Sequence, residues 1–250
     1  MKLQYSFLLL LLVALNFQAN AQQREGEIDY ERELIGGINF NTNGGLIGGF
    51  MLRYSRLLYE SKTQFHNFGL EVAVVKHHKE IRYAAQQSGS SFIAYKKNHM
   101  VVIRPSYGRE FVLLNKGNKD GVQLDLLLNG GLSFGVLTPY YIDYQTANGP
   151  AIVPYDPVNT PNVNQVINSA GYTSGLAQSK IVPGVHFKTG FSFEYSHFTN
   201  NVTGVEVGFL LEAFTQKMVI MQAPANSAGY FKNNQFFSSV YVTIFYGGRK

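Results

Sequence analysis

The stretch that decides the fold is VHFKTGFSFEY, residues 185–195. Its apolar and polar side chains alternate with a period of two, which is the repeat of a β-strand. One face carries Val185, Phe187, Thr189, Phe191, Phe193 and Tyr195, and the other carries His186, Lys188, Gly190, Ser192 and Glu194. We therefore predict a strand with one aromatic, apolar face and one face of charges and small residues.

Three further segments alternate in the same way, at residues 68–74, 122–136 and 205–212. In 122–136, Asp125 and Ser133 lie opposite a face of valine, leucine and phenylalanine. A soluble β-sandwich also alternates, but its polar face meets water. Here the polar face is rich in glycine, serine and isolated charges, which is typical of the crowded interior of a narrow barrel whose apolar face meets lipid.

The lengths of the connections indicate the same architecture. We predict eight strands, at residues 34–42, 46–58, 65–79, 98–114, 121–138, 182–198, 203–220 and 236–247. After a tight Asn43-Gly44 turn the connections are alternately short and long, and the longest are 80–97 and 139–181. Outer-membrane barrels have short periplasmic turns and long external loops. The sequence thus predicts an all-β fold, an eight-stranded antiparallel up-and-down transmembrane β-barrel with both chain ends in the periplasm.

The first residues have the composition of a secretory signal peptide. Lys2 provides a positive charge, residues 7–15 are apolar, and Ala19-Asn20-Ala21 offers the small residues that signal peptidase recognises. The apolar run is well short of the roughly 20 residues that a membrane-spanning helix needs, which disfavours a retained anchor. We predict a signal peptide at 1–21, a periplasmic segment at 22–33 and the barrel domain at 34–250.

Composition limits the chemistry and the partners of the chain. It contains no cysteine, which excludes a lipoprotein anchor, disulfides and cysteine-based catalysis. The formal net charge is +5 and the sequence pI is about 9.2. In an exported chain this basic balance favours outer-membrane lipid and lipopolysaccharide as neighbours, with other outer-membrane proteins, over nucleic acid. We predict no cofactor.

From Leu34 to Lys250 the chain resembles the OmpA/OmpX-like small outer-membrane β-barrels. The resemblance rests on the signal peptide, the alternating strands, the short and long connections, and glycine-bearing strands such as 35–39 and 45–50. It implies residence in the cell outer membrane. The sequence departs from the family pattern at its end, FYGGRK, where the aromatic pair precedes the last residue by several positions.

Strand parity predicts which charged side chains face the barrel interior. These are Arg53, Glu71, Arg104, Glu110, Asp125, Lys188, Glu194, Glu206 and Glu212. An eight-stranded barrel is just wide enough for side chains to fill its lumen, and buried charges of opposite sign must pair. A structural ion-pair network that fills the lumen is therefore the favoured interpretation, and an ion pathway is the alternative.

Basic residues gather where the third and fourth predicted strands meet the exterior. We predict a basic outer rim that faces lipopolysaccharide phosphates, formed by Lys76, His77, Lys79, Lys96 and Lys97. The histidines also suggest a metal site, with His77, His78 or His99 and Glu80 as ligands. Adjacent strand residues point to opposite faces, however, and we predict no metal.

Aromatic side chains at the strand ends suggest two membrane girdles. The inner set comprises Tyr54, Tyr59, Phe65, Phe68, Phe111, Tyr195 and Phe198, and the outer set comprises Tyr140, Tyr141 and Tyr144. The loop at 139–181 exceeds the usual length for a simple connection, so it either binds a partner, covers the lumen or is a mobile surface segment.

Several functions agree with such a barrel. We favour a structural or accessory envelope protein that acts through its external loops or its flank. A narrow channel for small solutes is the alternative, and a soluble lipocalin-like carrier is a further one. A lipid-modifying enzyme would need His99 to act with Ser90 or Ser91, and no Gly-x-Ser-x-Gly motif supports such a nucleophile. We predict that the chain is not an enzyme.

Overall fold

The structure is a computed structural model that describes residues 28, 30–59, 61, 63–115, 121–158, 163–195, 201–223 and 230–250. The predicted signal peptide lies outside the described residues, as does Phe198. No helix among the described residues has the length and apolar character to cross a membrane.

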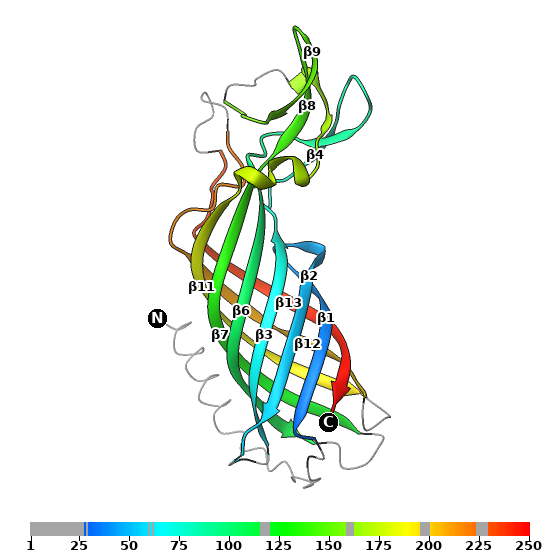
Figure 1. The fold of residues 1–250 in the computed structure, drawn as a ribbon, viewed down its shortest axis with the longest axis vertical. Helices are drawn as coiled ribbons and strands as arrows, with labels where there is room; N and C mark the ends of the chain where they lie inside the picture. The colour runs from blue at the N-terminus through cyan, green and yellow to red at the C-terminus, as the bar shows by residue number, and fades with distance from the viewer. Residues whose placement is uncertain are drawn as a thin grey trace, which may run out of the picture.

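Eight long strands close into one antiparallel barrel (Figure 1). In order around the wall they are β1 (Arg32–Asn41), β13 (Phe236–Arg249), β12 (Asn201–Phe214), β11 (Lys180–Tyr195), β7 (Val122–Pro139), β6 (Asn98–Leu114), β3 (Gln64–Val75) and β2 (Gly45–Leu57). The first and last strands pair with each other, with Ile38 opposite Ile244, so the sheet closes without a free edge. The predicted eight-stranded antiparallel β-barrel is confirmed.

Burial in this barrel is the reverse of that in a soluble protein. On β11, Phe187, Phe191 and Phe193 are 45–49% exposed, whereas Lys188 and Glu194 are buried. The apolar side chains therefore point away from the barrel and the polar ones point into it. An apolar outer surface of this kind is stable in contact with the hydrocarbon of a membrane.

Two strands are shorter than predicted. β3 ends at Val75 rather than at residue 79, and β12 ends at Phe214 rather than at residue 220. The alternation in FTQKMVI, residues 214–220, suggests a continuing strand, but beyond Phe214 the chain turns into the barrel mouth and buries Met218 and Ile220. An apolar side chain that is buried in the barrel mouth and one that faces outward have the same hydropathy, so the sequence pattern alone does not distinguish them.

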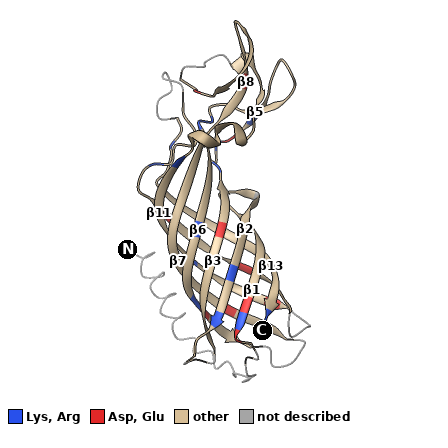
Figure 2. Cartoon of the chain, in the orientation of Figure 1, with Lys and Arg blue, Asp and Glu red and all other residues tan. Residues whose placement is uncertain are grey.

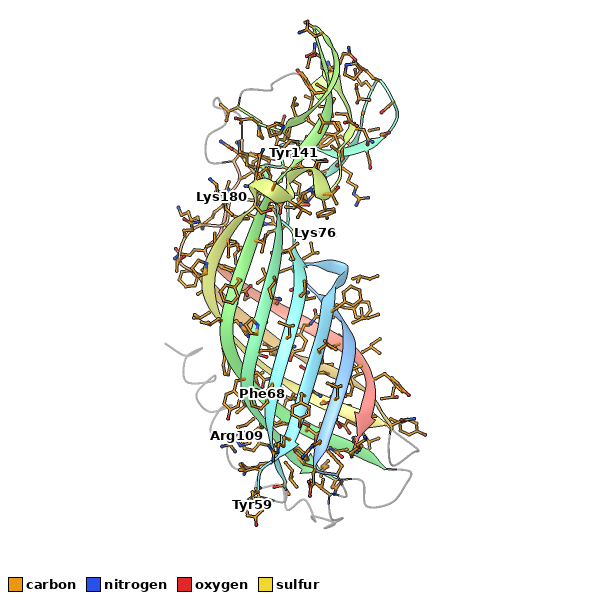
Figure 3. All side chains as sticks on the ribbon, in the orientation of Figure 1. Tyr59, Phe68, Lys76, Arg109, Tyr141 and Lys180 are labelled. Atoms are coloured by element: carbon orange, nitrogen blue, oxygen red, sulfur yellow. The ribbon has the colours of Figure 1, made fainter. Side chains whose placement is uncertain are left out.

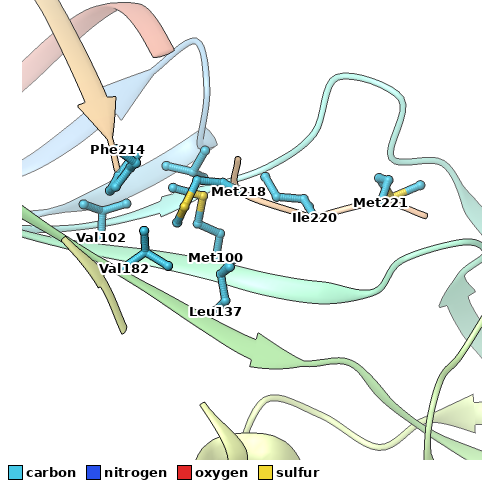
Figure 4. Packing of buried hydrophobic residues seen from close by; sticks show 9 residues of the cluster. Met100, Val102, Leu137, Val182, Phe214, Met218, Ile220 and Met221 are labelled. Atoms are coloured by element: carbon cyan, nitrogen blue, oxygen red, sulfur yellow. The ribbon is translucent and has the colours of Figure 1, made fainter. Parts of the chain in front are cut away.

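This inward turn forms an apolar plug in the end of the lumen nearest the long loops. Met218, Ile220 and Met221 pack against side chains from five strands, which are Val75, Met100, Val102, Leu137, Val182 and Phe214. Figure 4 shows the methionine side chains of residues 100 and 218 lying against each other at the centre of this cluster. The plug therefore excludes water from that end of the barrel.

The long loops fold into a head at one end of the barrel (Figure 1). β8 (Tyr141–Thr146) pairs with β9 (Gly149–Pro154) and β10 (Val166–Ser169), and β4 (Arg82–Ala84) pairs with β5 (Ser91–Ile93). Two short 3-10 helices, η1 (Val163–Gln165) and η2 (Thr173–Gln178), complete it. We define the head as residues 80–97 and 139–179. Its buried core comprises Ala85, Phe92, Ala94, Tyr140, Ile142, Tyr155 and Val166.

The predicted outer aromatic girdle is wrong. Tyr140 is only 1% exposed and Tyr141 is also buried, because both pack within or beneath the head rather than against lipid. At the opposite end Tyr54, Phe68 and Tyr195 do face outward, but Phe65 is fully buried and stacks on Tyr30 inside the lumen.

Candidate functional site

All nine predicted interior charges are buried inside the barrel. In Figure 2 charged residues are seen along the wall from the middle of the barrel to the end that lies away from the head. The structure divides them into linked networks below the apolar plug.

The network nearest the plug is centred on Arg104 of β6. Its Nε and Nη2 donate to the two oxygens of Glu212, at 2.8 and 2.9 Å, and its Nη1 donates to Glu71 at 2.7 Å. Lys188 Nζ donates to the other oxygen of Glu71 at 3.0 Å. Ser133 Oγ also donates to Glu212, at 2.6 Å. These charge-assisted bonds come from β3, β6, β7, β11 and β12, so they tie five strands together across the lumen.

The next network joins Arg53 to Glu206 at 2.6 Å. Tyr241 Oη donates to the second oxygen of Glu206 at 2.7 Å, and Lys188 Nζ lies 4.1 Å from the centre of the Tyr241 ring. Lys188 Nζ is also 3.5 Å from Glu206, so it links this network to the one above. Gly190 makes room for the tyrosine, because a Cβ there would lie 2.5 Å from the Tyr241 hydroxyl.

The last network lies where β1 and β13 meet at the turn end. Arg249 binds Glu33 at 3.2 Å and also donates to Glu194. Oxygens of Glu33, Glu110 and Glu194 lie within 4.8 Å of one another. Ser55 donates to Glu110 at 2.8 Å.

Asp125 in the same region has an amide partner. Gln123 Nε2 donates to both of its oxygens, at 3.0 and 3.1 Å, and to Tyr30 Oη at 2.9 Å. Among the described lumen residues, seven carboxylates face four cationic side chains. The lumen therefore has an excess of formal negative charge, concentrated at the turn end.

Sequence analysis missed Glu33, Arg249, Tyr30 and Tyr241 as lumen residues. Glu33 immediately precedes the predicted start of the first strand, and Arg249 lies just past the predicted end of the last one. Extending the same parity by two residues in each direction would have placed both inside. No sequence signal identified Tyr30 and Tyr241 as lumen residues, because tyrosine occurs on both faces of the wall.

A cavity of about 20 Å³ lies beside the networks and is lined by residues that include Arg53, Asn67 and Asn129. This volume is close to that needed for one water molecule. Around it, ion pairs and buried side chains occupy the described lumen below the plug.

The predicted basic outer rim needs correction at two residues. Lys96 is 3% exposed and its Nζ binds Glu80 at 2.8 Å, and His77 is also buried, with its ring stacked on His78 at 4.3 Å. Both lie beneath folded loops rather than at the surface, and burial lowers the pKa of each. Lys76 is exposed, as the prediction requires.

The other two rim residues are half-buried and have partners. Lys97 pairs with Asp156 at 3.4 Å, and Lys79 Nζ lies 4.2 Å from the Tyr230 ring centre. Two lysines of the rim, Lys76 and Lys79, are thus left with ammonium groups near the outer surface.

His99 packs as an aromatic side chain beneath the head. Its ring lies 3.9 Å from that of Tyr172 and 5.1 Å from that of Tyr140, and neither ring nitrogen has a hydrogen-bond partner among the described residues. Within the described part of the chain, the group of three or more possible metal ligands consists of the carboxylates of Glu33, Glu110 and Glu194 at the turn end and includes no histidine.

The comparisons with known proteins give low similarity. No model of a protein family matches the sequence, and no curated protein matches it significantly. Among solved structures, Ail, the attachment invasion locus protein of Yersinia pestis, is 10% identical, with 88% of this chain and 99% of that chain covered and a TM-score of 0.39.

Two further structures are similar to the same extent. Ail in complex with the heparin analogue sucrose octasulfate gives 10% identity and a TM-score of 0.38, with 88% and 99% of the two chains covered. Neisserial surface protein A gives 8% identity and a TM-score of 0.39, covering 88% of this chain and 97% of its own.

Proposed function

We propose that the chain is an integral outer-membrane protein with a structural or accessory role, whose closed barrel carries the head as a binding platform at the cell surface. The observation that carries this proposal is the head's own buried core, in which Tyr140, Tyr155 and Val166 are nearly inaccessible. A connection that merely joined two strands would not need such a core. Folded loops on a rigid scaffold are a common location for binding residues.

Two barriers in the lumen argue against a channel. The apolar plug closes the head end, and the Arg104 and Arg53 networks fill the barrel below it. A narrow channel remains the second candidate because the lumen is polar, and its excess of carboxylates would make it select cations. Purified protein in planar bilayers should give no steady conductance, whereas cation-selective steps would favour the channel.

The structure offers no support for catalysis by the residues first considered. Ser90 and Ser91 lie at the β4–β5 hairpin, while His99 is enclosed by Tyr140 and Tyr172. A nucleophile and its base must lie within hydrogen-bond reach. We therefore propose a binding role rather than an enzymatic one, with Lys76 and Lys79 positioned to contact lipopolysaccharide phosphates.

Membrane orientation can be tested by cysteine labelling, because the chain has no native cysteine. Ile152 lies on the head, Tyr59 lies at the turn end and Phe187 lies on the outer wall, and all three are exposed. A membrane-impermeant maleimide should label Ile152→Cys in intact cells, Tyr59→Cys only after permeabilisation, and Phe187→Cys in neither case without detergent. Labelling of all three in a soluble fraction would contradict the membrane location.

Binding by the head can be tested with photo-crosslinkers at Ile152 and Leu176, both exposed on it. In intact cells each position should give the same discrete adduct, and a crosslinker at Phe187 should not. Adducts that are equally abundant at all three positions would indicate contacts made by the barrel flank instead.

A further inference from the structure

A row of basic residues crosses five neighbouring strands near the turn end of the barrel. The cross-strand register places Arg32 opposite Arg56, Arg56 opposite His66, and His66 opposite Arg109. Lys250, which directly follows β13, is the fifth member of the row and lies opposite Arg32. Its N–H donates to the Arg32 carbonyl at 2.9 Å, and its carbonyl accepts from the Arg32 N–H at 2.8 Å. We call these five residues the basic row.

The basic row faces outward. The neighbours of its members along the chain, such as Glu33, Ser55 and Glu110, are buried in the lumen, so alternation directs the row itself to the outside. Arg32, Arg56 and Lys250 are exposed, and His66 and Arg109 are half-buried.

Among the described residues, no acidic side chain compensates the charge of the row. Within the described residues, none of its members has a carboxylate oxygen within 4.0 Å. Like charges placed directly opposite each other destabilise a sheet. An anionic partner from outside the chain would remove this repulsion.

An apolar and aromatic row lies directly beside the basic one. Leu34, Tyr54, Phe68 and Tyr107 are opposite one another in successive strands, each two residues from a member of the basic row and one step nearer the middle of the barrel. Tyr107 Oη lies 2.7 Å from His66 Nδ1, and its ring lies 5.1 Å from that of Phe68. Figure 3 shows Arg109 projecting from the wall between Phe68 and the turn end marked by Tyr59. Aromatic side chains occupy the headgroup level of membranes, which places the adjacent charges at phosphate level.

The cross-strand line of the basic row continues without charge among the described residues. It runs from Arg109 to Leu128, Thr189 and Phe209, none of which is charged. With neighbouring strands about 4.8 Å apart, the five members extend over about 19 Å, enough for more than one phosphate group. In the part of the wall that the structure describes, the row is therefore a localised patch.

We propose that the basic row binds the phosphate groups of anionic phospholipids in the periplasmic leaflet, with diphosphatidylglycerol as the lipid that fits it best. The proposal rests on the membrane orientation given above for the proposed function. Arginine binds phosphate oxygens in bidentate fashion, and a lipid with two phosphates satisfies several members of the row at once. The neighbouring apolar and aromatic row would contact the glycerol and upper acyl chains of the same lipid.

Native mass spectrometry of the full-length mature protein in detergent tests this binding independently of orientation in the cell. Diphosphatidylglycerol should be retained in preference to phosphatidylethanolamine. In the double variant Arg32→Gln with Arg56→Gln, apparent affinity for diphosphatidylglycerol should fall by about thirty-fold, or about five-fold for each arginine. Arg82→Gln and Lys180→Gln are matched controls, because both residues are exposed but lie on the head and at the head end of β11.

Three outcomes would overturn the proposal. The first is equal retention of the two lipids by the unmodified protein, which needs no variant. The second is an equal loss of lipid in the control variants. The third is displacement of the lipid by inorganic phosphate alone, which would indicate a site for free anions. Each variant must retain the unmodified protein's gel mobility shift on heating, so that a folding defect is not mistaken for lost binding.

Discussion

Replacing Arg104 with glutamine should strongly destabilise the barrel, and the structure indicates which partner is responsible. Arg104 is 4% exposed and binds both Glu71 and Glu212. Glu71 keeps a cation when the arginine is removed, because Lys188 lies 3.0 Å away. Glu212 keeps only the Ser133 hydroxyl at 2.6 Å among its hydrogen-bond partners in the described lumen, together with the nearby His186 ring.

Removing one member of a buried ion pair costs about 3–5 kcal/mol because a buried charge is left without compensation. We expect a loss of that size in the free energy of unfolding for Arg104→Gln, nearly all of it due to Glu212. Adding Glu212→Gln to the same chain should therefore recover about half of the loss or more. Glu71→Gln in the unmodified background should cost less, because Arg104 then keeps its two bonds to Glu212 and Lys188 keeps Glu206.

The assay is urea unfolding in lipid vesicles. Unfolding is monitored by tyrosine fluorescence and by the fraction of protein that keeps the mobility of the folded form on unheated gels. The unmodified protein, Arg104→Gln, Glu212→Gln and the double variant form a double-mutant cycle for the 104–212 pair. A loss under about 1 kcal/mol for Arg104→Gln, or no recovery in the double variant, would refute the reasoning. Either result would mean that water reaches Glu212 and that the lumen is not closed at this level.

Three further predictions concern the fit of Tyr241, the turn at residues 76–81 and the apolar plug. Gly190→Val should destabilise the barrel by about 1–3 kcal/mol in urea unfolding, because its Cβ would meet the Tyr241 hydroxyl, whereas Gly130→Ala, with its nearest contact at 3.6 Å, should be tolerated. Burial lowers the pKa of His77 below its ordinary 6.5, so His77 takes up a proton more readily when the turn at residues 76–81 is locally unfolded than when it is folded. The folded turn should thus be most stable above pH 6.5 and lose stability as the pH falls below it, and hydrogen exchange corrected for the intrinsic rate at each pH should show smaller protection factors there in acid but not in His77→Gln. Met218→Ala should cost about 2–5 kcal/mol by leaving a void in the plug, and unchanged unfolding would mean that the plug packs loosely.

The wall of the barrel could be predicted because its residues have only two environments. Every strand has one face toward the outside of the barrel and one toward the lumen, so successive side chains such as Phe187 and Lys188 alternate between the two. The ends of the strands were predicted less precisely because the alternation of apolar and polar residues fades there. Glu33 and Arg249 lie in those margins, and so they were missed although they belong to the lumen.

The head and the plug could not be predicted because their contacts join segments that alternation does not relate. Tyr140 looks like an interfacial tyrosine in the sequence, yet it is buried in the head, where its hydroxyl oxygen accepts the N–H of Ile93 from the other long loop at 3.0 Å. Met218 sits at an apolar position of an apparently continuing strand, yet it is buried against Met100 inside the mouth. In both cases an apolar side chain had two possible hydrophobic surroundings, lipid or a protein core. The choice between them is made by the packing of distant segments, because a side chain enters a core only where other chains leave a space that it fills.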